Sequence, residues 1–253
     1  MIEGIKKIDN NRIEYKGEVL NVPHHIAVIP DGNRRWARER GLSPIFGHKE
    51  GVETYKKLLE NAADIGVSYV TFYAFSTENW KRNEVEVEGL MSLLALQLKN
   101  FNKILGKNRD KIRFKVIGNR QGLSSSLQKA IAKMEEETQN NTELTAVIAI
   151  NYGGRDEMLH SVKSIINDVN SGFIKPENID EDTISKYLYT GDIPDPDLLI
   201  RTSGEERISN FLLWQLAYTE FYFDKCWWPD FSSKNLLEAI RVFSKRQRRY
   251  GGA

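Results

Sequence analysis

Short apolar runs alternate with longer amphipathic segments along most of the chain. The runs are rich in β-branched and aromatic residues, which is typical of strands buried in a sheet. Strands are predicted at residues 25–29, 69–75, 112–117, 145–150, 197–201 and 220–223. Helical spacing of apolar residues predicts helices at 49–65, 85–105, 125–138 and 155–169, with a shorter piece at 184–188. Because strands separated by helices form parallel crossovers, we expect an α/β fold with a central, mostly parallel six-stranded sheet flanked by helices.

The predicted helix at 85–105 has an unusually wide apolar stripe. Leu90, Leu94 and Leu98 follow helical spacing, and Leu93 widens the stripe. A stripe of this width indicates either a core helix with a broad buried face or one wall of a tunnel for a hydrocarbon chain. The pattern itself does not separate these two interpretations.

Charge and cysteine content limit the classes of partner. Lys and Arg total 36 against 35 Asp and Glu, a net charge of +1. The chain therefore has no overall positive field for nucleic acid, and any anion site must be local. The only cysteine, Cys226, excludes an intrachain disulfide and a thiolate zinc site. We expect a reducing, cytoplasmic compartment and no nucleic-acid partner.

The sequence predicts no membrane-spanning segment. Charges recur too often in the first twenty residues for a signal peptide. The longest uncharged apolar stretch, 208–219, is far shorter than the roughly 20 residues that span a bilayer. We expect a soluble protein, or one held peripherally at a membrane. We also expect a single domain over 1–253, with an N-terminal extension at 1–22.

A polar or glycine-containing turn follows five of the predicted strands. These turns contain residues 31–33, 76–79, 118–119, 151–154 and 202–204. In open α/β sheets the ligand lies outside the carboxyl ends of the strands, so we expect the chemistry at these turns. The sequence has neither a GxxxxGK[ST] P-loop nor a GxGxxG fingerprint.

The turn after the first strand combines a carboxylate with two arginines. Asp31 could hold Mg²⁺, which prefers carboxylate, water and phosphate oxygens, and Gly32 allows a ligand to approach the backbone closely. Arg34 and Arg35 stand at the start of a helical segment, whose free N–H groups suit phosphate. The alternative is an N-cap at Asp31 with surface arginines, and the cluster alone leaves both open.

Two further clusters offer groups for anions. Arg201 and Arg207 lie six residues apart, and with Ser209 they could grip one diphosphate, because arginine makes bidentate contacts to phosphate. A solvated salt-bridge loop is the alternative. The other cluster follows the second strand and contains Ser76, Asn79, Trp80 and Arg82.

Two single residues are also candidates. His48, near the start of a predicted helix, is either a local hydrogen-bonding residue or a site group. Glu220 is the only charged residue between Arg207 and Asp224, so it is either a buried carboxylate that needs a partner or a site residue. Several anion-binding turns beside a broad apolar helix indicate a substrate with diphosphate heads and an apolar tail.

Five blocks of sequence resemble the cis-prenyltransferases, the family of undecaprenyl diphosphate synthase. In family order they are HIAVIPDGNRRW at 25–36, FGHK at 46–49, YAFSTENW at 73–80, NYGGR at 151–155 and IRTSGEERISNFLLWQ at 200–215. The resemblance covers about residues 24–250. It implies a Mg²⁺-dependent homodimer that condenses isopentenyl diphosphate with an allylic prenyl diphosphate to form a Z-configured chain. It also implies an active site that leads into a hydrophobic tunnel.

The resemblance implies roles for particular residues. Asp31 is implied to coordinate Mg²⁺ on the diphosphate, with Glu220 near the metal and the subunit interface. The implied allylic diphosphate cradle contains Gly32, Asn33, Arg34, Arg35 and Trp36, with Arg82 nearby. The implied isopentenyl diphosphate site contains Arg201, Arg207 and Ser209.

The resemblance also implies two mobile or exchanged parts. Arg249 and Gly251 belong to a C-terminal RxG tail, 245–253, that reaches across the dimer to the isopentenyl site. Asn79 and Trp80 belong to a loop that positions the substrates. The base that takes the proton stays open among Asn33, His48, Ser76 and a phosphate oxygen of the substrate.

Two departures from the family pattern bear on the substrate. The family usually has an arginine four residues before the motif histidine, where this chain has Pro44. Ile150 stands where long-chain synthases often have alanine, whereas Ala74 remains small. A larger side chain on a tunnel wall limits product length by steric exclusion, so we expect a short or medium product.

Two alternatives remain at this level. One is a prenyltransferase with an unusual acceptor or mode of condensation, which Pro44 favours. The other is a non-catalytic partner subunit of a heteromeric enzyme. Such subunits typically lack the Asp31-Gly32-Asn33 cluster, so its presence favours a self-sufficient enzyme.

Overall fold

A six-stranded sheet forms the centre of the computed structural model, which describes residues 2, 4–102, 108 and 110–246. Its strands are β4 (His25–Ile29), β5 (Tyr69–Ser76), β6 (Ile112–Ile117), β7 (Leu144–Tyr152), β8 (Leu198–Arg201) and β9 (Glu220–Phe223). Their order is β6-β7-β5-β4-β8-β9, and every neighbouring pair is parallel. The predicted α/β fold with six strands is confirmed.

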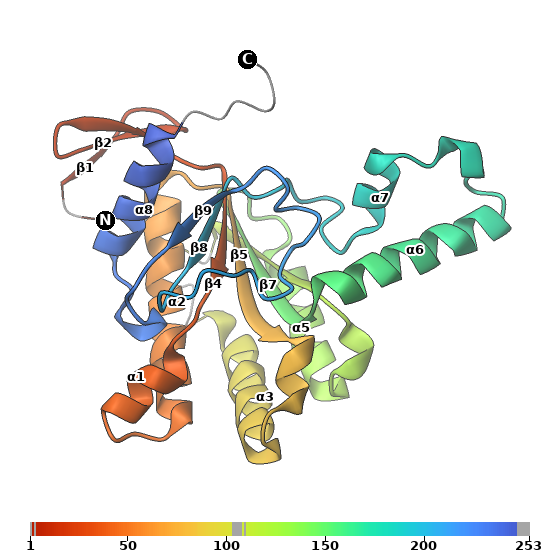
Figure 1. The fold of residues 1–253 in the computed structure, drawn as a ribbon, viewed down its shortest axis with the longest axis horizontal. Helices are drawn as coiled ribbons and strands as arrows, with labels where there is room; N and C mark the ends of the chain where they lie inside the picture. Colours follow the sequence, from red (N-terminus) through yellow and green to blue (C-terminus); the bar gives the residue numbers. More distant parts are fainter. Residues whose placement is uncertain (1, 3, 103–107, 109, 247–253) are drawn as a thin grey trace.

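Helices flank the sheet, as the alternating pattern predicts (Figure 1). They are α1 (Asn33–Glu39), α2 (Pro44–Ile65), α3 (Glu84–Lys99), α5 (Ser125–Thr138), α6 (Gly154–Asn170), α7 (Glu181–Tyr187) and α8 (Ser233–Lys245). Short 3₁₀ turns are η1 (Thr77–Lys81), η3 (Arg120–Gly122), η4 (Pro176–Asn178) and η5 (Trp228–Asp230). No described helix is long and apolar enough to cross a membrane.

Two predicted helix boundaries differ by five residues or more from those in the structure, and the others differ by three residues or fewer. Helix α2 begins five residues earlier, because Pro44 occupies its first turn, where the missing N–H of proline costs no hydrogen bond. Helix α3 ends at Lys99, and Asn100 caps it by donating its backbone N–H to the carbonyls of Leu96 and Gln97. Residues 103–105 of the predicted helix lie outside the described residues.

Residues 5–21, within the segment predicted only as an extension, form a second sheet. Its antiparallel strands are β1 (Ile5–Lys7), β2 (Arg12–Tyr15) and β3 (Glu18–Asn21). Glu18 accepts two hydrogen bonds from Arg241 on α8, at 2.7 and 2.6 Å. Ser244, also on α8, accepts a bond from the Asn21 amide at 2.8 Å. These contacts attach the small sheet to the end of the described chain.

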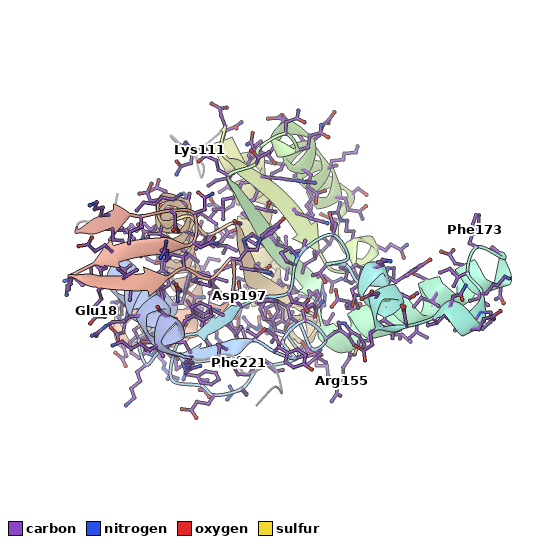
Figure 2. All side chains as sticks on the ribbon, turned by 90° about the horizontal axis from the view of Figure 1, so that it is seen from above. Glu18, Lys111, Arg155, Phe173, Asp197 and Phe221 are labelled. Atoms are coloured by element: carbon purple, nitrogen blue, oxygen red, sulfur yellow. The ribbon has the colours of Figure 1, made fainter. Side chains whose placement is uncertain are left out.

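Alternation along the strands divides the core between the two faces of the central sheet. Ile26 and Val28 of β4 pack with α2, α3, α5 and α8 on one face, and Ala27 and Ile29 pack with the 208–216 segment on the other. Helices α6 and α7 project away from the body as an arm (Figure 1). Figure 2 shows Arg155 at the base of this arm and Phe173 at its far end.

Candidate active site

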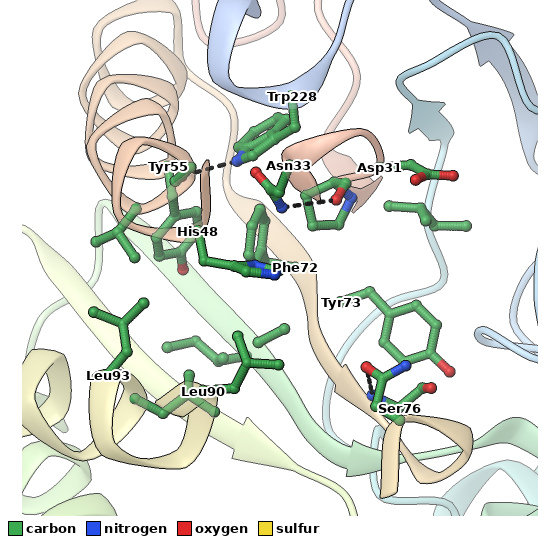
Figure 3. A pocket seen from close by; sticks show the side chains of 18 of the residues that line it. Asp31, Asn33, His48, Tyr55, Phe72, Tyr73, Ser76, Leu90, Leu93 and Trp228 are labelled. Carbon is green, nitrogen blue, oxygen red and sulfur yellow. Dashed lines mark hydrogen bonds between the residues drawn. The ribbon is translucent and has the colours of Figure 1, made fainter. Parts of the chain in front are cut away.

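A cavity of about 640 Å³ opens at the carboxyl ends of β4, β5 and β8 and runs between the sheet, α2 and α3. This volume is in the usual range for a small-molecule site. Polar residues at the mouth include Asp31, Asn33, His48, Ser76, Asn79, Arg82, Arg201 and Ser209. The inner wall is apolar and includes Leu93, Leu98, Phe114, Met134 and Ile148. Figure 3 shows the polar and apolar groups around the same space. The broad stripe of α3 is therefore a cavity wall.

The end of β4 fixes the backbone of Asp31. Its N–H donates to Thr202 Oγ1 at 2.9 Å, and that hydroxyl donates to the Asp31 carbonyl at 2.7 Å. The backbone N–H of Trp228 donates to the same carbonyl at 2.9 Å. Gly32 follows with φ of 103°, and a Cβ there would lie 2.7 Å from the Trp227 ring. Only glycine fits this turn without displacing the indole.

Two arginines hold the Asp31 carboxylate. Arg201 Nη2 lies 2.9 Å from Oδ2, and Arg35 Nη2 lies 3.1 Å from Oδ1. Partial burial acts to raise the pKa of Asp31, but the hydrogen bond and charge of Arg201, helped by Arg35, keep it below its usual value. Asp31 is therefore ionised at neutral pH. The Arg201 side chain is only 4% exposed, whereas Asp31 is 27% exposed and so remains accessible from the mouth.

Glu205 links the two predicted arginine clusters, and the motif analysis did not single it out. One of its oxygens accepts from Arg35 at 2.9 Å, and the other accepts from Arg207. Arg201 also donates to Ser209 Oγ at 2.8 Å and to the carbonyl of Arg207. Arg207 itself is largely exposed and is not among the residues that line the cavity.

The cluster after β5 is only partly directed at the cavity. Ser76 caps η1, and its N–H donates to Asn79 Oδ1 at 3.1 Å. Arg82 donates to Glu86 at 3.0 Å, and Arg34 lies 3.7 Å from the same carboxylate oxygen. Ser76, Asn79 and Arg82 line the cavity, but Trp80 does not. The Trp80 N–H instead donates to Asn151 at 2.7 Å.

Three polar atoms at the mouth lack hydrogen-bond partners among the described residues: Asn33 Oδ1, His48 Nε2 and Arg201 Nε. Asn33 is oriented by its amide N–H, which donates to the Pro30 carbonyl at 3.3 Å. Burial, with the nearby charge of Arg82, lowers the pKa of His48 to about 4. The imidazole is therefore neutral at pH 7 and available to a ligand.

Several predicted site residues lie elsewhere. Trp36 donates its indole N–H to Asp230 at 2.7 Å and stacks against Arg40, so the structure does not bring it to the cavity. Glu220 begins β9 opposite Leu198, at the amino end of the strands, and pairs with Arg246 at 2.6 Å. Asp31 follows the carboxyl end of β4, so one chain does not bring these two carboxylates to one cation. Arg249 and Gly251 of the tail lie outside the described residues.

Ile150 is not a wall of the cavity. It is fully buried in the core, and the residue of β7 that lines the cavity is Ile148, two positions earlier. Ile148 pairs with Phe72 of β5, which also lines the cavity. The expectation that Ile150 limits the length of the product is therefore wrong for this cavity. The β7 side chain in a position to limit it is Ile148.

Helical spacing counted from His48 could have found three further lining residues that the sequence motifs missed. His48, Gly51, Val52 and Tyr55 lie on one face of α2 and all line the cavity. The tyrosine, unlike the histidine, lies in no recognised block. Trp228 of η5 also lines the cavity. No sequence motif marks it, because only the folding of the chain brings η5 next to α2.

Comparisons with known proteins agree over nearly the whole chain. A family model described as "Putative undecaprenyl diphosphate synthase" matches residues 29–251. An isoprenyl transferase of Fusobacterium nucleatum is 53% identical over 232 residues, covering 92% of this chain and 97% of the relative. One from Staphylococcus saprophyticus is 48% identical over 250 residues, covering 98% of each.

Solved structures show the same likeness. The lavandulyl diphosphate synthase of Lavandula x intermedia, in complex with dimethylallyl diphosphate, gives a TM-score of 0.86 at 38% identity, with 90% of this chain and 98% of that chain covered. A "probable undecaprenyl diphosphate synthase" from Campylobacter jejuni gives 0.75 at 31% identity, with 92% and 100% covered.

Proposed function

Because the chain belongs to the undecaprenyl diphosphate synthase family of prenyl transferases, we propose that it condenses isopentenyl diphosphate with an allylic prenyl diphosphate. The observation that carries this proposal is the cavity, in which a polar mouth with Arg82 and Arg201 continues directly into an apolar interior. Such a space suits a diphosphate head with a hydrocarbon tail. In the reaction, C4 of isopentenyl diphosphate bonds to C1 of the allylic partner, diphosphate leaves C1, and a proton leaves C2.

Arg201 at the mouth, with Arg35 and Arg207 in the same ion-pair cluster, would hold the diphosphate groups. Arg35, Arg201 and Arg207 share only the carboxylates of Asp31 and Glu205, so this cluster keeps an excess of positive charge. Guanidinium groups make bidentate contacts to phosphate and stabilise the charge that develops on the leaving diphosphate. Because their positions are fixed by ion pairs before substrate arrives, little reorganisation is needed.

Asp31 fits a role in binding Mg²⁺ together with the substrate. Among the described residues there is no group of three His, Cys, Asp or Glu that could form an all-protein metal site. Mg²⁺ commonly binds through one or two carboxylates plus substrate phosphates and water, which matches a single ionised Asp31 at the mouth. The ion would neutralise part of the charge on the diphosphate.

The proton from C2 is best accepted by the substrate's own diphosphate. His48 has a pKa of about 4 and so has little tendency to take a proton at pH 7. Asn33 and Ser76 have no basic nitrogen. The unpaired Asn33 Oδ1 and His48 Nε2 instead orient polar parts of the bound substrates.

The apolar interior would hold the growing chain. Phe114, Met134 and Ile148 close the wall on the side of β6, α5 and β7. Their bulk supports a short or medium product, because a packed wall excludes further units. We also propose a homodimer, and an association with membranes that depends on the lipid-like product.

One second candidate has specific support: a synthase that uses another prenyl acceptor. Pro44 stands where the family usually has an arginine, and it serves here to begin α2. The likeness to lavandulyl diphosphate synthase shows that this fold also occurs in a protein named for a different product. A non-catalytic partner subunit is disfavoured, because Asp31, Arg35 and Arg201 form a complete ion-pair cluster.

The test is incorporation of labelled isopentenyl diphosphate by the purified protein with Mg²⁺ and C5 to C20 allylic diphosphates in separate reactions. Mass spectrometry of the extracted products should give a ladder that ends at one length. A parallel reaction with dimethylallyl diphosphate alone tests the second candidate, which predicts a product there. No product in any reaction by folded protein would reject both.

A further inference from the structure

Tyr55 occupies an inner position on the cavity wall. It lies seven residues after His48 on α2, which is two helical turns, or about 10 Å further from the mouth. Its ring packs against Phe72, with ring centroids 4.4 Å apart. Figure 3 shows Tyr55, His48 and Phe72 grouped on one side of the cavity, with Leu90 and Leu93 across from them.

The hydroxyl of Tyr55 is unusual because it has no hydrogen-bond partner among the described residues. The residue is 6% exposed. Tyr73, another buried tyrosine of the cavity wall, donates its hydroxyl to the Tyr152 carbonyl at 3.2 Å. Tyr152 in turn donates to Glu157. A buried polar atom without a partner is normally destabilising, and phenylalanine would fill the same space without that cost.

The chemistry of the surroundings limits what could pair with this hydroxyl. Burial raises the pKa of Tyr55 far above its ordinary value, so the hydroxyl keeps its proton and remains a donor. Phe72, which packs against the Tyr55 ring, and Leu90 and Leu93 across the cavity offer no oxygen or nitrogen acceptor in their side chains. A ligand that enters this part of the cavity is therefore the source of an acceptor.

We propose that Tyr55 is a specificity-determining residue whose hydroxyl donates to the π electrons of a double bond in the bound prenyl chain. This inference rests on the proposed function, which places such a chain in the cavity. An isoprenoid has one double bond in each five-carbon unit, and a double bond accepts a weak hydrogen bond where a saturated chain accepts none. Tyr55 thereby favours an unsaturated isoprenoid over a saturated alkyl chain of equal length.

The experiment compares farnesyl diphosphate with its 6,7,10,11-tetrahydro analogue, which keeps the allylic bond needed for reaction. For each, kcat/KM with isopentenyl diphosphate is measured in the wild type, in Tyr55→Phe and in Tyr222→Phe. Tyr222 lies on β9 and is not among the lining residues, so it is the matched control. The preference for farnesyl diphosphate should fall about twofold to fivefold in Tyr55→Phe and stay unchanged in Tyr222→Phe.

A preference that is the same in Tyr55→Phe and the wild type would overturn the role of Tyr55 and would indicate that the hydroxyl pairs with water. Calorimetric binding of non-hydrolysable thiolodiphosphate forms of both primers gives the same comparison without turnover. If the wild type binds both primers but incorporates no isopentenyl diphosphate, the proposed function fails, and the binding ratio alone decides the role of Tyr55.

Discussion

Asp31 is the residue on which most of the charged contacts at the cavity mouth depend. Its carboxylate accepts hydrogen bonds from Arg35 and Arg201, and its backbone is hydrogen-bonded to the Thr202 hydroxyl and to the Trp228 backbone N–H. Three segments that are far apart in the sequence, at 31–35, 201–202 and 228, therefore meet at one turn. This arrangement aligns the arginines before any substrate is present, which is the property that electrostatic stabilisation of a leaving diphosphate requires.

Replacing Asp31 should reduce turnover strongly while preserving the fold. In Asp31→Asn an oxygen remains for Arg201, but the negative charge that attracts Mg²⁺ is gone. We expect kcat to fall about 10²- to 10³-fold, measured by incorporation of labelled isopentenyl diphosphate. Asp230→Asn, which alters a carboxylate paired with Trp36 and Arg40, is the control. A rate within threefold of wild type for Asp31→Asn would contradict the assigned role.

His25 should make the stability of the protein depend on pH. Its Nδ1 lies 2.6 Å from the Pro194 carbonyl and its Nε2 lies 2.7 Å from Thr71 Oγ1, an arrangement that suits a neutral ring. Burial lowers its pKa from 6.5 to about 4. The unfolded state therefore binds more protons between these values, and stability is lost as the pH falls from 6.5 toward 4.

Urea unfolding at pH 7.5 and pH 5 measures this effect. At pH 5 the free energy of unfolding of the wild type should have lost about 2 kcal/mol through His25. Glutamine does not titrate. Between pH 7.5 and pH 5 the free energy of unfolding of His25→Gln should therefore fall by about 2 kcal/mol less than that of the wild type. Equal losses in the two proteins would show that His25 does not carry the pH dependence.

Residue types and their order predicted the polar mouth better than the inner wall. Arg201 ends β8, and Asp31 and Arg35 come shortly after the end of β4; parallel strands bring such ends together, so their proximity was predictable. Glu220 is the first residue of β9, which places it at the opposite end of the parallel strands. Ile150 and Ile148 share one face of β7, and only the depth of the cavity separates their roles.

At the scale of elements, close packing of α2 against α1 sets the position of the mouth. A Cβ at Gly47 would lie 2.0 Å from the Asn33 carbonyl oxygen. A Cβ at Gly51 would lie 2.5 Å from Asn33 Oδ1. The two helices can therefore approach this closely only because α2 has glycine at both positions, and this approach places His48 beside Asn33.

Gly47→Ala should destabilise the protein, although alanine usually favours a helix over glycine. The clash with backbone must separate α1 from α2, and we expect the free energy of unfolding to fall by about 1–3 kcal/mol. Gly89→Ala on α3 is the matched control, since its nearest contact would be Ile45 at 3.6 Å. That variant should gain about 1 kcal/mol from helix propensity. Urea unfolding midpoints, compared at equal m-values, measure the stability of both variants. A Gly47→Ala variant that is more stable than the wild type would contradict the packing argument.

Several elements have their predicted bounds although their burial differs, such as the buried β4 and the half-buried β9. All five residues of β4 are buried, and its predicted bounds match the structure. Strands β1 to β3 are three or four residues long and have only two buried residues, Ile13 and Leu20, so no clear alternation indicated them. Helix α8 was not predicted, although Leu236, Leu237 and Ile240 form an apolar stripe after the Ser232 cap.

At the scale of the whole molecule, the arm formed by α6 and α7 carries apolar side chains away from the core (Figures 1 and 2). Leu159, Val162 and Ile166 lie on one face of α6 and are 50–52% exposed. Phe173, at the far end, is 82% exposed. An apolar stripe of this kind on an extended arm is typical of an interface, and it supports the proposed homodimer.

A pair of charged substitutions tests whether this stripe joins two copies of the chain. Leu159→Glu with Ile166→Glu should convert the dimer into a monomer, measured by light scattering during size-exclusion chromatography. Introducing like charges on both copies places them opposite one another in a symmetric contact, where each substitution counts twice. Lys129→Glu with Lys133→Glu on α5 is the matched control and should leave the mass unchanged. A double variant that remains dimeric would place the interface elsewhere, whereas a monomeric wild type would reject the homodimer itself.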